Sequence, residues 1–295
     1  MKDRRPPVLP SGVTPAAVDA LHRRILGWYG EHRRDLPWRR TRDPYAILVS
    51  EVMLQQTQVP RVVPRYEEFL RAWPRLEDLA AAELADVLLA WRGLGYNNRA
   101  RRLRECAIAA VAAMTASCAD ARDPTLDAGA PRAALPDSVE GLRALPGIGP
   151  YTARAVLIFA HNLDLAAVDA NVRRVLTSEL GLPEDLGDRD LQAVADAALP
   201  AGRSRDWHNA LMDYGSLVLT AKATGIASRT RQAPFEGSRR WYRSRLLRSL
   251  LDGGPQPLTG LSALAGLDAP AAADIVRSLQ ADGLVVLDGD VVRVA

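Results

Sequence analysis

The sequence predicts a mainly α-helical protein, and three observations support this fold class. Alanine and leucine are abundant while aromatic residues make up only 5% of the chain, which favours helices. Alternating apolar and polar residues, the pattern of a half-buried strand, occur only near the C-terminus. The chain has 295 residues, 48% of them hydrophobic, which is enough for two or three domains with a sizeable core.

The N-terminal half reads as a series of helices separated by prolines and glycines. Residues 1–12 precede a helix expected over Pro15–Arg33, which "DLPW" ends. The next helix starts at "TRDPY" and carries Glu51. Beyond it we expect short helices divided by Pro60, Pro64 and Pro74. Two further helices are expected to end on Gly93 and Gly95, and one longer helix is expected over 98–115.

The second half contains two segments that are polar, rich in proline and glycine, and without periodicity. These segments, 116–135 and 225–238, are expected to be loops or linkers. Helices are expected between them, from Ser138 to Thr224.

The C-terminal tail has its own pattern. "GLVVLDGDVVRVA" predicts a strand, an Asp-Gly turn and a second strand. Three helices are expected before it: 239–252, 258–265 and 268–282. Three helices followed by a hairpin resemble a winged-helix module over residues 238–295, which either binds DNA or packs on the rest of the chain.

Basic residues are concentrated in three stretches, although the net charge is only +3 and the pI is about 9.1. The stretches are "HRRDLPWRRTR", "NNRARRLR" and "GSRRWYRSRLLR", and two of them contain aromatic residues. Any one stretch is equally well explained as a solvated helix face. Because arginine suits phosphate, the three together favour a nucleic-acid partner.

The cysteine pattern indicates neither a metal site nor a disulfide framework. Cys106 and Cys118 have no metal-ligand spacing, so we expect reduced thiols in an intracellular protein. Residues 1–10 do not resemble a signal peptide, and no apolar run is long enough to span a membrane.

Glu51 lies at the edge of a predicted helix face that packs into the core. The apolar residues of this face recur at three-and-four spacing: Tyr45, Leu48, Val49, Val52 and Met53. A carboxylate beside such a face is costly unless it is exposed, paired or used.

"LRALPGIGPYTARAVLIFA" is the sharpest local motif. A short helix ends at Leu145, Pro146 with Gly147 and Gly149 makes a tight hairpin, and a second helix starts near Pro150. Backbone N–H groups at that helix N-terminus would attract a phosphate. The alternative is an ordinary helical hairpin.

Asp169 lies in "AAVDANVRRVL", directly before a predicted helix. The position suits an N-cap residue. The apolar approach over 165–168 would also carry the carboxylate inward, so Asp169 is equally a candidate functional group.

These motifs resemble those of the helix–hairpin–helix–GPD superfamily of DNA base-excision glycosylases, and within it the MutY-type adenine glycosylases. The similarity extends over about Leu21–Thr220. Its matching segments are "LPWRRTRDPYAILVSEVMLQQTQVPRVVPRY", "LLAWRGLGYNNRARRL", "LPGIGPYTARAVL", "VDANVRRVL" and "NALMDYGSLVLT".

The resemblance implies a two-lobed helix–hairpin–helix glycosylase fold. One discontinuous lobe would comprise 1–35 and 136–230 and carry Asp169. A helical barrel lobe over 36–135 would carry Glu51. The helix–hairpin–helix motif, 139–161, would lie near the lobe junction.

The resemblance also implies catalytic roles. Glu51 would be the acid that protonates the departing adenine, Asp169 the carboxylate that faces an oxocarbenium-like sugar, and Asn171 a residue that positions the site near Asp169. Tyr151 stands where bifunctional relatives carry a lysine nucleophile, so the implied enzyme is monofunctional and leaves an abasic site.

The implied substrate contacts place a flipped base in the site. The residues expected to contact DNA are Gln55, Gln56, Tyr96, Arg99, Gly147, Ile148, Gly149 and Thr152, although Tyr96 also suits a core position. Main-chain carbonyls of Arg143, Leu145 and Ile148 match those that hold a monovalent cation, Na⁺ or K⁺, at the hairpin.

Three features depart from the family pattern. Leu219 stands at the first of four expected cluster cysteines, so no 4Fe–4S cluster is expected, and Arg229 and Arg231 are candidates to replace its role. The short tail is not the Nudix-like domain that usually reads 8-oxoguanine. Asn97 replaces a second tyrosine, which puts the opposite-base specificity in question.

The predicted function is therefore a monofunctional DNA glycosylase that excises adenine opposite G or 8-oxoguanine, without a required cofactor. Two alternatives stay open: a glycosylase for another base, such as T or U opposite G or a damaged purine, and a non-catalytic DNA-binding protein. The expected partner is mismatched or damaged double-stranded DNA. A monomer associated with the nucleoid in the cytoplasm, without a membrane, is expected.

Overall fold

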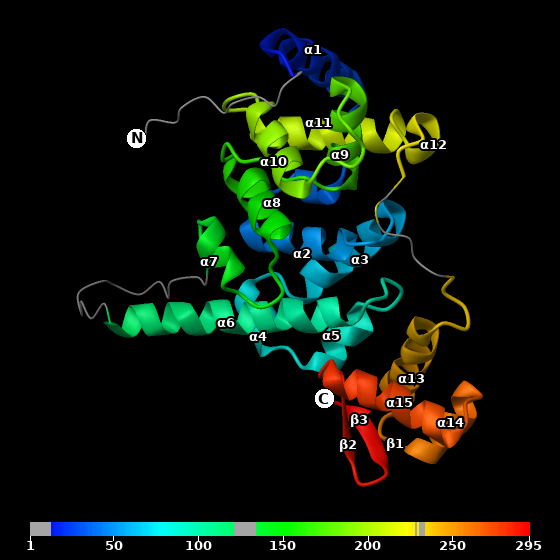
Figure 1. Ribbon diagram of the computed structural model, residues 1–295. Helices are drawn as coiled ribbons and strands as arrows, with labels where there is room; N and C mark the ends of the chain where they lie inside the picture. The colour runs from blue at the N-terminus through cyan, green and yellow to red at the C-terminus, as the bar shows by residue number, and fades with distance from the viewer. Residues whose placement is uncertain (1–12, 121–133, 228, 230–233) are drawn as a thin grey trace. The chain divides into compact units, whose positions relative to one another are not determined.

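The computed structural model describes residues 13–120, 134–227, 229 and 234–295 (Figure 1). These residues are mainly helical, with one small sheet near the C-terminus, which confirms the predicted fold class. The chain divides into two compact units. The first comprises Met1–Leu48, Asp137–Arg143 and Gly149–Arg231; the second comprises Val49–Pro136, Ala144–Ile148 and Gln232–Ala295.

The first unit is a helical bundle whose core lies between α1, α9 and α11. Ile25, Val172 and Trp207 from these three helices are almost completely buried there. The helices of this unit are α1 Pro15–His32, the 3₁₀ turn η1 Pro37–Arg39, α7 Val139–Arg143, α8 Pro150–His161, α9 Ala170–Leu180, α10 Asp188–Ala197, α11 Ser204–Leu217 and α12 Ala221–Thr224. Thr14 caps α1, which begins at Pro15 as predicted.

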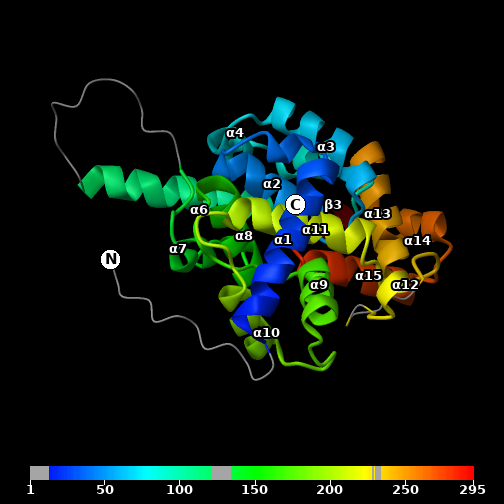
Figure 2. The ribbon, with the colours of Figure 1, turned by 90° about the horizontal axis from the view of Figure 1, so that it is seen from above.

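The second unit is built around the long helix α6, Asn98–Asp120 (Figure 2). Two short helices, α4 Leu76–Ala81 and α5 Leu84–Ala90, pack against it, and α3, Val59–Ala72, packs against α5. Phe69 and Trp91 are fully buried and meet edge to face.

The C-terminal module belongs to the second unit and has the helix and strand order of a winged helix. Its elements are α13 Arg239–Gly253, β1 Gln256–Pro257, α14 Leu258–Ala265, α15 Ala269–Ala281, β2 Val285–Asp288 and β3 Val291–Val294. The antiparallel sheet has the order β1-β3-β2, with Val285 opposite Val294. The three helices and the hairpin are confirmed, while β1 was missed because two residues give no alternation.

Two elements differ from the sequence expectation. α6 continues to Asp120, into the segment expected to be a linker; residues 121–133 of that linker lie outside the described residues. The boundary between the two units falls after Leu48, inside the continuous helix α2, Pro44–Leu54, rather than after residue 35. Within the described chain, no helix is both long and apolar enough to cross a membrane.

Candidate functional site

Glu51 is buried in α2, with 8% of its surface exposed. The predicted single apolar face is an incomplete description, because Ile47, Leu48 and Ser50 are no more than 1% exposed and cover different sides of the helix. A helix that is apolar all round is buried all round. The Glu51 side chain therefore belongs to a stretch of helix, residues 45–53, in which every residue is buried.

Gln55 and Gln56 follow α2 and are exposed, as expected of residues that would contact DNA. Gln56 has a left-handed backbone, with φ of 56°, and Tyr96 has φ of 48° with 37% of its surface exposed. Left-handed angles are costly for side chains with a Cβ and persist only where the surroundings enforce them.

Arg99 anchors the two segments that carry these residues. It is 9% exposed, and its terminal nitrogens bind both loops from inside the second unit. The acceptors are the carbonyls of Val52 (2.7 Å), Met53 (3.0 Å), Gln55 (2.7 Å), Leu94 (3.0 Å) and Gly95 (3.0 Å) and the Thr57 hydroxyl (3.1 Å). Burial lowers the pKa of Arg99 to about 10, which leaves it charged at neutral pH. This geometry favours a positioning role for Arg99 over the direct DNA contact that the sequence suggested.

The turn between α7 and α8 has the backbone that the glycine pattern predicted. Gly147 has φ of 78°, and a Cβ there would lie 2.8 Å from Cβ of Arg102. Gly149 is the N-cap of α8 and Pro150 its first residue. Ile148 and Thr152 are buried, at 8% and 4% exposure, so the main chain rather than these side chains is available to a phosphate.

Asp169 caps α9, and its carboxylate is also shielded from water. Both roles that the sequence allowed, N-cap and inward-facing carboxylate, are therefore compatible with the structure. Its Oδ1 accepts from the Val172 N–H at 2.7 Å, and its Oδ2 accepts from Nδ2 of Asn171 at 3.1 Å. Burial raises the pKa of Asp169, and these hydrogen bonds and the charge of Arg174 only partly oppose the rise.

Arg174 and Gly215 support Asn171, and sequence reasoning missed both. Nη2 of Arg174 donates to Oδ1 of Asn171 and to the Gly215 carbonyl, each at 2.6 Å, and its Nε donates to the Leu219 carbonyl. A Cβ on Gly215 would lie 2.9 Å from Cβ of Asn171. The available signal was the spacing of Asn171 and Arg174, which places them on one helix face.

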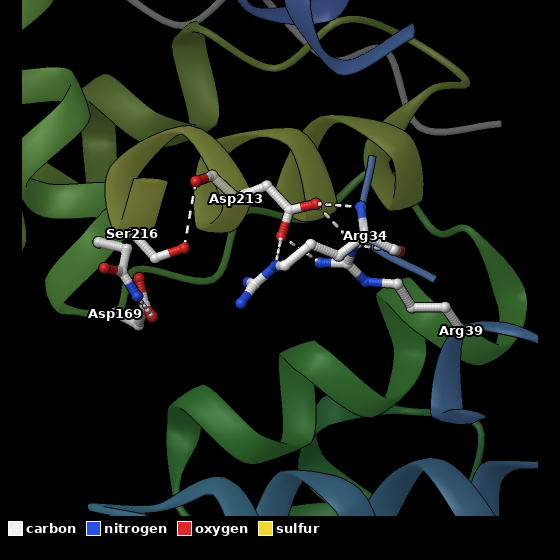
Figure 3. A network of polar contacts seen from close by, with 6 residues as sticks. Arg34, Arg39, Asp169, Asp213 and Ser216 are labelled. Carbon is white, nitrogen blue, oxygen red and sulfur yellow. Dashed lines mark hydrogen bonds and ion pairs between the residues drawn. The ribbon is translucent and has the colours of Figure 1, made fainter. Parts of the chain in front are cut away.

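Asp213 on α11 is a second charged centre in the first unit, and Figure 3 shows two guanidinium groups directed at it. Arg34 donates through Nε (2.6 Å), and Arg39 donates through both terminal nitrogens (2.7 and 2.8 Å). The Asp213 side chain is 0% exposed. Two arginines of the first basic stretch are thus committed to an internal carboxylate.

The predicted site residues are divided between the two units. Tyr151 is half-buried in the first turn of α8, in the same unit as Asp169 and Asn171. Glu51 belongs to the second unit, with Gln55, Tyr96 and Arg99.

The predicted ligands of the monovalent cation are the main-chain carbonyl oxygens of Arg143, Leu145 and Ile148. Among the described residues, no cluster of three His, Cys, Asp or Glu could hold a metal ion. The Leu145 carbonyl accepts a long bond from the Ile148 N–H, 3.4 Å, which leaves it a lone pair, and neutral carbonyls suit Na⁺ or K⁺. The cation stays a prediction.

Known proteins resemble this chain in sequence and in fold. The family described as HhH-GPD superfamily base excision DNA repair protein matches residues 49–198. Adenine DNA glycosylase of Mycolicibacterium smegmatis is 38% identical over 90% of this chain and 92% of its own length. Human adenine DNA glycosylase is 37% identical over 70% of this chain and 37% of its own length.

Solved structures agree with these sequence matches. A thermostable thymine-DNA glycosylase is 27% identical with a TM-score of 0.61, covering 72% of this chain and 94% of its own. Endonuclease III in a trapped covalent intermediate with DNA has the same fold, with a TM-score of 0.58 at 17% identity, covering 75% of this chain and 91% of its own. The hairpin before α8, the capping carboxylate before α9 and these matches lead to one conclusion: the chain belongs to the HhH-GPD superfamily of base excision DNA repair proteins.

Proposed function

We propose that the protein is a monofunctional DNA glycosylase that hydrolyses the N-glycosidic bond of adenine mispaired with G or 8-oxoguanine. The observation that carries the proposal is the 38% identity to an adenine DNA glycosylase over nearly the whole length of both chains. The burial of Glu51 and the enclosure of Asp169 supply the two carboxylates that this chemistry requires.

Glu51 is proposed as the general acid. Protonation of adenine at N7 allows the base to leave as a neutral molecule, and an acid must still hold its proton at neutral pH to supply it. Glu51 is buried on a helix whose other buried residues are mostly apolar, which is the kind of position that this role requires.

Asp169 is proposed as the carboxylate that faces the sugar. Loss of the base leaves positive charge on the sugar ring, which water then quenches at C1′. Burial raises the pKa of Asp169 in the free protein. An adjacent cation favours the ionised form, so the carboxylate would stabilise the transition state more than the ground state.

Because residue 151 is a tyrosine, the enzyme is proposed to lack lyase activity. A phenol cannot form a Schiff base with the sugar, whereas a lysine at this position could. The expected product is an intact strand with an abasic site. Borohydride added during turnover should trap no covalent protein–DNA complex, and a trapped complex would contradict this assignment.

The protein is also proposed to act as a monomer on double-stranded DNA, associated with the nucleoid, without an iron–sulfur cluster. A cluster needs four cysteine thiolates, and the sequence has two cysteines. The protein around Leu219 supplies its own contacts: Arg174 binds the Leu219 carbonyl, Ile226 is buried, and Arg229 binds the Leu186 carbonyl. Arg231 lies outside the described residues. Iron analysis and light scattering of the purified protein test these statements.

One assay tests the function. Duplexes containing A·8-oxoG, A·G, T·G, U·G or hypoxanthine are incubated with the protein and then treated with alkali. Strand breaks at adenine are expected. Breaks only at T or U would replace adenine by a pyrimidine, an outcome worth including because the 27% identical structure is a thymine-DNA glycosylase. No break in any duplex would favour a DNA-binding protein.

Glu51→Gln is the sharpest variant, because it keeps the shape of the side chain and removes the acid. It should abolish excision while retaining binding to the A·8-oxoG duplex. Glu67→Gln, the same change at an exposed position on α3, is the matched control and should keep full activity. An active Glu51→Gln protein would refute the acid role.

A further inference from the structure

The C-terminal module contacts the loop that carries Tyr96 through one arginine. Nη1 of Arg240, in the first turn of α13, donates to the Tyr96 hydroxyl at 2.5 Å. The guanidinium carbon of Arg240 lies 5.5 Å from the centre of the Tyr96 ring. Arg99 lies 5.6 Å from the same ring centre. Two cations thus hold one partly exposed tyrosine, at a distance where ring and cation attract.

Further contacts fix the module against the same part of the second unit. Arg92, in the turn after α5, forms an ion pair with Asp252 near the end of α13. Asp282, at the end of α15, accepts a hydrogen bond from Asn98 and pairs with Arg243. Gly283 lies against Arg101, because a Cβ there would be 3.2 Å from Nη1 of that arginine. The residues that make these contacts, 92, 98 and 101, lie on both sides of Tyr96 in the sequence.

The elements that usually read DNA in a winged helix have the wrong charge here. All 13 residues of α15 are described, and its one arginine, Arg277, lies 3.7 Å from the Asp274 carboxylate. The turn between β2 and β3 carries Asp288 and Asp290. Phosphate contact requires positive charge, so these elements make a poor DNA-reading surface.

We propose that Arg240 is a positioning residue for DNA binding and that the C-terminal module braces the Tyr96 loop instead of reading DNA through α15. Arg99 fixes the backbone of the loop from inside and Arg240 fixes the ring at its hydroxyl. A rigid, partly exposed aromatic ring is suited to stack on a base. The proposal rests on the proposed function in one respect, namely that Tyr96 meets DNA.

A double-mutant cycle in the full-length protein tests the brace. Arg240→Met keeps the aliphatic stem and removes the guanidinium, and Tyr96→Phe removes only its hydroxyl partner. Each should weaken binding to an A·8-oxoG duplex by about tenfold, the lower end of the range for one hydrogen bond to a charged group. The double variant should be no weaker than either single variant, because both remove the same interaction.

Arg277→Met is the matched control, since it removes the same charge from the same module. It should leave binding unchanged. The slope of binding against salt should also be the same for Arg240→Met and wild type, because a positioning residue neutralises no phosphate. Additive effects in the cycle, a slope reduced by about one for Arg240→Met, or equal weakening by Arg277→Met would each overturn the proposal.

Hydrogen exchange separates this proposal from the proposed function. In the free protein, Arg240→Met should speed exchange of the backbone amides over 93–98, whatever base the enzyme excises. Unchanged exchange would overturn the brace even in an active adenine glycosylase. Faster exchange with unchanged DNA binding would overturn the role of Tyr96 as a DNA contact. If the coupled binding loss and faster exchange occur in a protein that excises no adenine, the brace holds and the proposed function fails.

Discussion

Asp169 and Asp213 are two carboxylates withdrawn from water on neighbouring helices of one unit, yet their pKa values shift in opposite directions. Burial raises the pKa of Asp169, whose direct hydrogen-bond donors are the Asn171 side-chain amide and the backbone N–H groups of Val172 and Asn171. Burial would also raise the pKa of Asp213, but the bonds and charges of Arg39 and Arg34 reverse the direction and lower it. Asp213 has its countercharge within the fold, whereas Asp169 is held in place without full neutralisation.

The difference separates a structural carboxylate from a candidate catalytic one. A carboxylate saturated by two arginines has little left to offer a developing cation, while one held by neutral donors gains a partner when the sugar becomes positive. Four substitutions test this contrast.

The largest effect is expected for Asp169→Asn. Asparagine caps a helix as well as aspartate does, but it cannot stabilise a cation, so the excision rate should fall by about a thousandfold. Single-turnover kinetics on the A·8-oxoG duplex measure the loss. Asp268→Asn, the same change at the N-cap of α15, is the control and should leave the rate unchanged.

Asp169→Asn is expected to lower the activity but to raise the stability of the protein at neutral pH. Because the pKa of Asp169 is raised in the folded state, the folded protein binds more protons than the unfolded chain above the ordinary value of 3.8. The wild type therefore loses stability as pH rises through that window, and the variant does not. The variant should be more stable than wild type at pH 7, by a margin that vanishes towards pH 4. A variant less stable at neutral pH would contradict the raised pKa.

Asp213→Asn is expected to destabilise the fold by about 3 kcal/mol, because it leaves the partly buried charges of Arg34 and Arg39 without their carboxylate. Urea unfolding at pH 7 measures this loss. The lowered pKa of Asp213 means that its stabilisation is present above the ordinary carboxyl range and is lost as pH falls below it. Asp206→Asn, on an exposed position of α11, is the control. An equal loss in both variants would indicate a general charge effect.

Arg174→Met is the next test, because Arg174 holds Asn171 by a hydrogen bond and its charge also lowers the pKa of Asp169. The change frees the Asn171 amide to rotate and leaves the Gly215 and Leu219 carbonyls without this donor. We expect excision to slow by about 10- to 100-fold, the range of one or two charged hydrogen bonds. Loss of the nearby positive charge should also move the acidic limb of the pH–rate profile upward. Arg189→Met, on the exposed face of α10, should change neither quantity.

The sequence was sufficient to predict the N-cap position of Asp169, the helix that carries Glu51, the hairpin and the elements of the C-terminal module. Each depends on local chemistry: a carboxylate within an apolar helix, glycines at a turn, an N-cap before a helix, and an Asp-Gly turn between short strands. The predicted bounds of α14, 258–265, agree with the structure to the residue.

The partners of those groups were not predictable, because they come from distant parts of the chain. Arg34 and Arg39 read as phosphate-binding residues, but an aspartate 174 or more residues away accepts their hydrogen bonds. Arg99 likewise read as a DNA contact, while its acceptors are carbonyls of two other segments. The sequence shows where charged residues lie along the chain, but only the tertiary fold shows which of them are paired with one another.

The smallest effect is expected for Gly215→Ala. The new methyl group would lie 2.9 Å from Cβ of Asn171 and 3.1 Å from its carbonyl, so α9 or the Asn171 side chain must shift by a few tenths of an ångström. We expect a several-fold slower excision and a stability loss of about 1 kcal/mol from overpacking. Gly27→Ala in α1, where a Cβ meets nothing within 4 Å, is the control and should slightly stabilise the protein. If Gly215→Ala lost stability without slowing excision, close packing at Asn171 would serve the fold alone, and the contrast between Asp169 and Asp213 would rest on their hydrogen-bond partners.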